Sequence, residues 1–125
     1  MIKMYYRGGC GSSKRALLWF QKYHLNTEKT LITCITKQEL IQLLKFSEKG
    51  IKDILKRSGR IGFKNNEKIG KIMDMSFNDA LDYILLHTEV LQTPIIMEGD
   101  NYLIGYNDDE IRIFLPKSYR RHHSQ

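Results

Sequence analysis

The chain begins with a strand, a glycine turn and a helix that carries a cysteine at its head. Residues 2–6 (IKMYY) are apolar and aromatic, and Gly8 and Gly9 end the run, which is typical of a strand. Residues 12–24 have apolar side chains at helical spacing, and residues 27–35 are mostly β-branched, which predicts a second strand. Since a strand–helix–strand unit joins parallel strands, the first third of the chain predicts an α/β fold.

The middle of the chain is predicted to be helical. Thr36 and Glu39 have the spacing of a capping box, so we expect a helix that begins at Thr36 and ends at Gly50. Residues 58–71 are basic and rich in glycine and asparagine, which predicts a mobile connection. Ser76 begins a further helix with a clean apolar stripe.

The last third predicts a hairpin and a short final helix. Residues 93–106 (TPIIMEGDNYLIGY) contain two apolar runs around a glycine turn, as in a hairpin. Asn107 caps the helix that follows, and Pro116 ends it. This order of elements is that of a thioredoxin-like fold, in which Pro94 would form a cis peptide bond beside a reactive thiol.

Bulk properties limit the class of protein. The 125 residues are enough for one domain with one core, and 42% hydrophobic residues argue against disorder. No apolar run is long enough to span a membrane, and the first residues lack the apolar core of a secretory signal. Two cysteines make no disulfide framework. We therefore expect a cytoplasmic protein with a single domain at 1–118, an inserted helical part at about 36–88 and a basic tail at 119–125.

The net charge of +6 is concentrated in two places. One is the stretch from Lys49 to Lys71, and the other is the ending KSYRRHHSQ. Both are explained equally well by a solvated surface or by an acidic partner such as nucleic acid. His122 and His123 are too few for a metal site, and His24 and His87 are expected near helix ends, so we expect no metal and no cofactor.

Four segments resemble the Spx/ArsC family, and together they cover nearly the whole chain. They are YYRGGC (residues 5–10), LLKFSEKGIKDIL (43–55), MSFNDALDYILLH (75–87) and TPIIMEGDNYLIGYNDDEIRIFLPK (93–117). The resemblance implies a thioredoxin-like mixed sheet with an inserted helical subregion. It also implies one of two functions: arsenate reduction by a cysteine nucleophile with arginines that hold the oxyanion, or Spx-type transcription regulation through the C-terminal domain of the RNA polymerase α subunit.

Cys10 is the candidate reactive thiol. A helix N-terminus favours the thiolate, and Arg7, Lys14 and Arg15 add positive charge nearby. The alternative is a small residue packed at a tight turn. Many Spx proteins sense oxidants through Cys-x-x-Cys, but Ser13 stands where the second cysteine would be, and a hydroxyl forms no disulfide.

Two further positions bear on the chemistry of this thiol. Cys34 is the remaining cysteine, which is either a partner for Cys10 or a residue that fills space in the fold. Thr93, after Gln92, stands where the resemblance places an arginine before the proline, and Arg57 and Arg60 are candidates for the missing charge. We therefore expect no arsenate reductase activity, with a reductase that uses Cys10 as the alternative.

A monothiol glutaredoxin is a third interpretation. Its C-G-x-S motif matches residues 10–13 and would imply a bound iron–sulfur cluster and glutathione, but the later segments do not resemble that family.

The binding role depends on a different part of the chain. By the resemblance, Gly50 matches a glycine at the polymerase contact, with Lys45 and Lys49 beside it; the alternative for Gly50 is an ordinary helix end. The basic stretch could then contact promoter DNA non-specifically within the complex. The sequence thus predicts an Spx-type regulator that binds the α subunit and has Cys-x-x-Ser in place of the redox pair.

Overall fold

The computed structural model describes residues 1–57 and 62–117. Arg60, His122, His123 and the tail at 119–125 lie outside these residues. The chain forms two compact units, one made of Met1–Thr30 with the chain from Thr93 onward, the other of Leu31–Gln92. The helical part expected at about 36–88 falls within the second unit.

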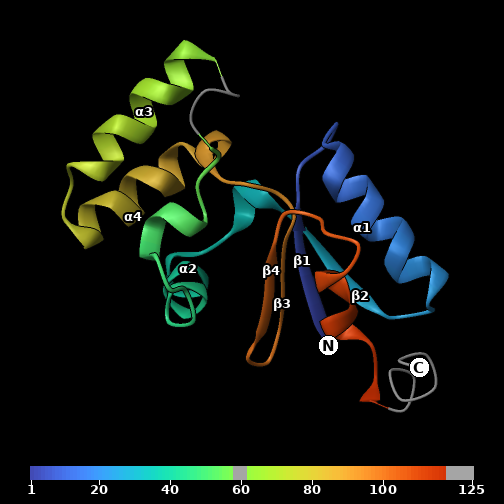
Figure 1. The fold of residues 1–125 in the computed structure, drawn as a ribbon. Coiled ribbons are helices and arrows are strands. Elements are labelled where there is room, and N and C mark those ends of the chain that lie inside the picture. The colour runs from blue at the N-terminus through green and yellow to red at the C-terminus, as the bar shows by residue number, and fades with distance from the viewer. Residues whose placement is uncertain (58–61, 118–125) are drawn as a thin grey trace. The chain divides into compact units, whose positions relative to one another are not determined.

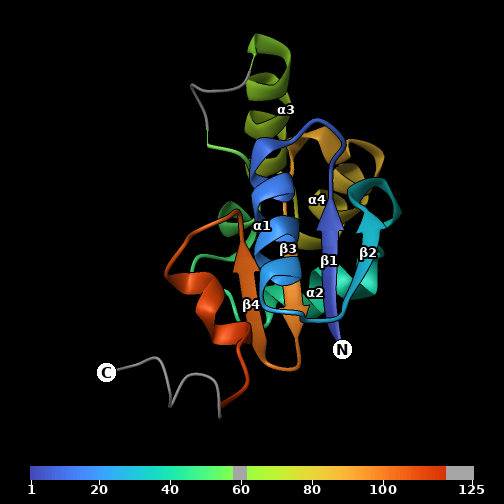
Figure 2. The ribbon, with the colours of Figure 1, turned by 90° about the vertical axis from the view of Figure 1, so that its right-hand side faces the viewer.

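The first unit is built on a four-stranded sheet. Its strands are β1 (Ile2–Tyr6), β2 (Thr27–Leu31), β3 (Ile95–Glu98) and β4 (Asn101–Ile104), in the order β2-β1-β3-β4. The arrows of β1 and β2 run in the same direction (Figure 2), whereas β3 is antiparallel to both β1 and β4. The sheet is therefore mixed, as the order of elements predicted.

One helix and the final segment pack against this sheet. Helix α1 (Gly11–Lys22) joins β1 to β2, and the 3-10 helix η4 (Glu110–Phe114) follows β4 (Figure 1). The buried side chains form one cluster: Ile2, Met4, Ala16, Phe20, Ile96, Leu103, Ile111 and Phe114. Ala16 and Phe20 are four residues apart, so they share one face of α1, and the ring centroids of Phe20 and Phe114 lie 5.9 Å apart. This packing fixes the start of α1, where Cys10 lies.

The second unit is helical. It contains α2 (Lys37–Leu44), α3 (Phe63–Met73) and α4 (Phe77–Leu86), with three short 3-10 helices, η1 (Ile32–Cys34), η2 (Gly50–Asp53) and η3 (Thr88–Val90). Ion pairs join elements within this unit: Lys37 Nζ lies 2.9 Å from Asp82 Oδ1, and Lys68 Nζ lies 2.6 Å from Glu89 Oε2. In the described residues no helix is long and apolar enough to cross a membrane.

Predictions that rested on local capping and turn chemistry are confirmed. Thr36 and Glu39 form the expected capping box, and the Ser76 side chain accepts a hydrogen bond from the Asp79 N–H at 3.3 Å. Glu98 pairs with Asn101 across a two-residue turn, in which Gly99 has a φ of +58°. A positive φ at the first turn position favours glycine, which explains this residue in the hairpin.

Other boundaries were wrong. Helix α2 ends at Leu44 and not at Gly50, because the N–H groups of Phe46 and Ser47 bond three residues back, to Leu43 and Leu44. The second strand stops at Leu31 and not at residue 35, because a 3-10 turn places both Ile32 and Ile35 in the interior at a spacing of three.

The predicted mobile connection at 58–71 is also wrong for its second half, which belongs to α3. Ile72 is buried on this helix and Lys68 is held by Glu89, so tertiary packing outweighs the weak helix preference of glycine and asparagine. The last helix, which was expected to be an ordinary helix, is the five-residue 3-10 helix η4. Its entry is held by Asn107, whose Oδ1 accepts from the N–H groups of Asp109 and Glu110 at 2.9 Å each.

Candidate functional site

Cys10 lies at the start of α1, directly after the turn that follows β1. Its N–H donates to the Arg7 carbonyl at 3.2 Å, and its carbonyl accepts the first helical hydrogen bond, from the Lys14 N–H at 3.1 Å. Gly9 adopts a φ of +75°, which a residue with a side chain rarely does. The glycine turn therefore places the thiol, which is partly exposed, at the N-cap of α1.

Thr93 is one of two hydroxyl-bearing neighbours of this thiol. Only 7% of Thr93 is exposed, and its Oγ1 donates to the Cys10 Sγ at 3.2 Å. The same oxygen accepts from Nη1 of Arg7 at 3.5 Å. The Thr93–Pro94 peptide bond is cis. A guanidinium thus reaches the thiol through one hydroxyl, although no arginine precedes the proline.

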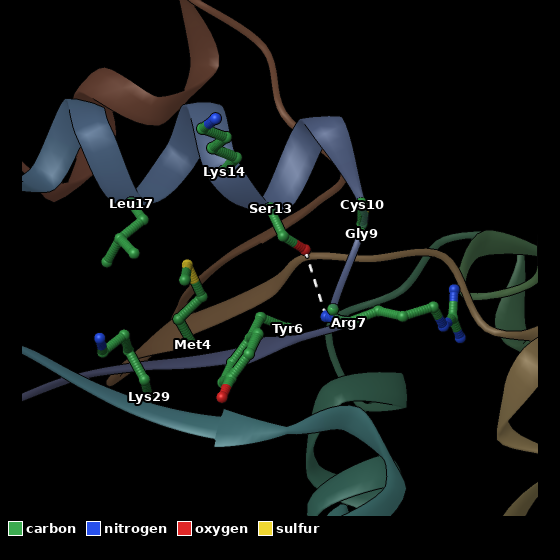
Figure 3. Close-up of a pocket in the computed structure, with 10 residues that line it drawn as sticks. Met4, Tyr6, Arg7, Gly9, Cys10, Ser13, Lys14, Leu17 and Lys29 are labelled. Atoms are coloured by element: carbon green, nitrogen blue, oxygen red, sulfur yellow. Dashed lines mark hydrogen bonds between the residues drawn. The ribbon is translucent and has the colours of Figure 1, made fainter.

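Ser13 lines the other side of the thiol. It is 4% exposed, and its Oγ accepts a hydrogen bond from the Arg7 N–H at 3.4 Å (Figure 3). The hydroxyl also hydrogen bonds to the sulfur and favours its charged form. Ser13 therefore occupies the place of a second cysteine as a hydrogen-bond partner of Cys10.

These contacts set the pKa of Cys10. Burial raises this pKa, but the hydrogen bonds from Ser13 and Thr93 lower it by more, and the result is about 7 in place of 9.0. The backbone N–H groups of Ser12 and Ser13 add to the effect without making a capping hydrogen bond to the sulfur. The lowered pKa increases the share of Cys10 that is thiolate near neutral pH, and the thiolate is the nucleophilic form.

A pocket of about 230 Å³ opens beside Cys10. Met4 and Leu17 point into it from β1 and α1, and Tyr6 lines the strand side (Figure 3). Lys14 and Lys29 extend from α1 and β2. The pocket belongs entirely to the first unit.

Gly50 lies in a second candidate site, which we call the Gly50 turn (residues 47–53). Gly50 has a φ of +69°, and a side chain built on it would meet no atom within 4 Å. The Ser47 hydroxyl lies 3.1 Å from the Gly50 carbonyl and also hydrogen bonds to the Asp53 carboxylate, which accepts from the Lys49 N–H at 3.2 Å. The turn is thus tied internally and open on its outer side.

The Asp53 carboxylate is held in its charged form within this turn. The hydrogen bond from Ser47 is the largest cause that lowers its pKa, followed by the contacts with Lys49. Lys49 is exposed within this turn, and Lys45, the C-cap of α2, is exposed two residues before it.

The remaining candidates are Cys34, Arg57, His87 and His24. Cys34 is exposed in η1, and its Sγ lies 4.0 Å from the Thr33 hydroxyl. Arg57 is exposed in the second unit. His87 lies 3.4 Å from the Glu89 carboxylate, and His24 follows the end of α1 with a φ of +54°. Within residues 1–57 and 62–117, no group of three histidine, cysteine or carboxylate side chains could hold a metal ion.

Sequence reasoning missed two parts of these sites. Arg7 was expected to act as a charge near the loop, but it acts through Thr93, which is 86 positions away in the chain. Asp53 was not singled out, although its spacing of six residues from Ser47 allows the contact that ties the Gly50 turn. The Arg7–Thr93 contact leaves no local pattern in the sequence. The Ser47–Asp53 contact does, because short polar side chains near a glycine turn often hydrogen bond to one another or to the backbone.

Comparison with known proteins identifies the family. The model of the ArsC family matches residues 5–114. The chain belongs to the ArsC family. Among curated ArsC-family relatives, a protein of Streptococcus pneumoniae named global transcriptional regulator Spx is 33% identical over 97% of this chain and 90% of its own length. A protein of Streptococcus agalactiae with the same name is 32% identical over 97% and 88%.

Solved ArsC-like structures share the fold. A Staphylococcus aureus protein matches with a TM-score of 0.75 at 19% identity, over 90% of this chain and 97% of its own. The arsenate reductase of Vibrio cholerae matches with a TM-score of 0.67 at 14% identity, over 91% and 94%. At these identities the likeness shows the fold alone, which is the thioredoxin-like α/β fold that the sequence predicted.

Proposed function

We propose that this ArsC-family chain is a cytoplasmic transcription regulator of the Spx type, which binds the C-terminal domain of the RNA polymerase α subunit. The observation that carries the proposal is the identity of 31–33%, over 97% of the chain, to proteins named global transcriptional regulator Spx. The similarity extends through both compact units, so it covers the Gly50 turn as well as the thiol loop.

The Gly50 turn is the proposed contact surface. Its outer side is open at Gly50, and the exposed Lys45 and Lys49 precede Gly50 by five residues and one residue. An open backbone with positive charge nearby in the chain suits a partner that carries carboxylates. The Ser47–Asp53 contacts hold the turn in one conformation before the partner arrives, which lowers the entropy cost of binding.

A comparison of three variants tests this surface. Gly50→Arg and Gly50→Asn both place a side chain at a left-handed position, but asparagine is small and tolerates that conformation. We expect Gly50→Arg to abolish co-purification with the α-subunit domain and Gly50→Asn to weaken it much less. Gly99→Arg, at another glycine of positive φ, is the control for strain and added charge. Normal binding by Gly50→Arg would reject the proposed surface.

Promoter DNA is a proposed secondary partner within the complex. Lys64 and Lys71 are exposed on α3, which carries three lysines and one carboxylate, Glu67, so the helix has a net positive charge. Phosphate contacts are sequence-tolerant and weaken as salt rises. We expect Lys64→Gln/Lys71→Gln to reduce the salt dependence of promoter binding by the complex and to leave binding to the isolated α-subunit domain unchanged. An unaltered salt dependence would exclude these two lysines from the DNA contact.

Thiol chemistry at Cys10 is the second candidate function. The lowered pKa of Cys10 and its hydroxyl donors favour a reactive thiolate, as in the arsenate reductases of the family. The two functions separate in one variant. Cys10→Ser should retain binding to the α-subunit domain if the chain is a regulator, and should lose thiol-dependent arsenate reduction if the chain is also a reductase.

A further inference from the structure

The pocket beside Cys10 has the character of a small-molecule site. Its inner wall is apolar, since Met4 and Leu17 line it from β1 and α1, and Tyr6 adds an aromatic face. The pocket volume of about 230 Å³ is roughly eight times the ~30 Å³ that one water molecule occupies in the liquid. The space therefore suits the short apolar body of a small ligand.

The rim of the pocket is positively charged. Lys14 and Lys29 line it from α1 and β2, and both are exposed. Neither ammonium forms an ion pair with a residue that the structure describes, and no carboxylate lines the pocket. An anionic group at the rim would therefore gain attraction from two lysines without displacing an internal partner.

We propose that this pocket binds a small amphiphilic carboxylate, with its apolar body between α1 and the strands and its carboxylate between Lys14 and Lys29. Cys10 lies at one end of the same pocket, so the bound molecule covers the thiol and slows its reactions. The site would make the reactivity of Cys10 respond to an anionic metabolite. This inference does not depend on the proposed partner at the Gly50 turn.

The test uses octanoate as the probe and the alkylation of Cys10 as the readout. In a Cys34→Ser background Cys10 is the single thiol, because the chain has two cysteines. In the reaction, the Cys10 sulfur forms a bond to the methylene carbon of iodoacetamide and iodide leaves. We expect saturating octanoate to slow this alkylation at least threefold, with a saturable dependence on concentration. Octanol and octylamine have the same apolar body without the negative charge and should have little effect.

Matched variants assign the effect to the pocket. Lys14→Gln/Lys29→Gln should remove most of the protection, whereas Lys22→Gln, which changes another lysine of α1 outside the pocket, should keep it. Each result is the ratio of rates with and without octanoate, so a changed thiol pKa in a variant cancels. Calorimetry on Cys10→Ser should still detect octanoate. Equal protection by octanol, protection that survives the double substitution, or no protection at all would overturn the proposal.

Discussion

At the scale of single residues, the hydroxyl groups of Ser13 and Thr93 set how reactive Cys10 is. Thr93→Val keeps the shape of the side chain but removes the hydroxyl that donates to Sγ at 3.2 Å and accepts from Arg7. We therefore expect the pKa of Cys10 to rise from about 7 towards its ordinary value of 9.0. The pH dependence of iodoacetamide alkylation measures this pKa directly.

Two further variants complete this experiment. Ser13→Ala removes the other hydroxyl and should shift the pKa of Cys10 in the same direction. Thr33→Val removes a hydroxyl near Cys34 and should leave Cys10 unaffected. If neither Thr93→Val nor Ser13→Ala raised the pKa of Cys10, the hydrogen bonds would not be the cause of the shift.

The lowered pKa of Cys10 also predicts how stability changes with pH. Because the folded state favours the thiolate, Cys10 stabilises the fold fully above pH 9, and this contribution is lost as the pH falls towards about 7. The free energy of unfolding of the native protein, relative to Cys10→Ser, should therefore rise between pH 7 and 9 and then level off. Urea unfolding at several pH values tests this, and a constant difference would contradict it.

At the scale of elements, the capping box at the start of α2 is worth a measurable amount of stability. The Thr36 N–H donates to Glu39 Oε1 at 2.9 Å, and the Glu39 N–H donates to Thr36 Oγ1 at 3.1 Å. Thr36→Ala should lower the free energy of unfolding by about 1 kcal/mol, while Thr36→Ser should lower it much less. Gln38→Ala changes an exposed residue of the same turn and serves as the control in urea unfolding. Equal losses for Thr36→Ala and Gln38→Ala would show that the cap adds nothing.

The Gly50 turn should loosen when Asp53 is replaced. Asp53→Ala removes the acceptor of both the Ser47 hydroxyl and the Lys49 N–H, so the Lys49 amide should exchange with solvent several times faster. Affinity for the α-subunit domain should fall in the same variant, because the turn must then be ordered on binding. Lys52→Ala is the control, since Lys52 is exposed and lies in the same turn. Slow Lys49 exchange in Asp53→Ala would contradict the first expectation, and unchanged affinity the second.

The elements that could be predicted from sequence are those with local causes. The capping box, the Ser76 cap and the hairpin at Gly99 each depend on residues within four positions of one another. The errors arose where tertiary packing decides. Ile72 and Lys68 hold α3 in a segment whose composition predicts a connection, and the interior positions of Ile32 and Ile35 shorten the second strand.

At the scale of the whole molecule, the local parts of the candidate site could be predicted from the sequence, whereas its long-range contacts could not. Cys10 at the head of a helix was visible in the sequence, because strand, glycine turn and helix are consecutive. Arg7 was expected only as a charge near Cys10, yet it contacts Thr93, which is 86 positions away in the chain. Only the folded sheet brings these residues together, so no pattern of spacing could have shown it.

Oxidation of Cys10 should therefore end at the sulfenic acid and should not go on to a disulfide within the chain. Peroxide oxidises the Cys10 thiolate by transferring one oxygen: an S–O bond forms, the O–O bond breaks and hydroxide leaves. Ser13 holds the position of a local second cysteine and cannot form a disulfide. After mild peroxide treatment, we expect dimedone to trap Cys10 sulfenic acid to the same extent in the native protein and in Cys34→Ser, as measured by mass spectrometry. Trapping in Cys34→Ser alone would instead mean that Cys34 resolves the oxidised thiol as a disulfide, and the chain would then be a two-cysteine switch.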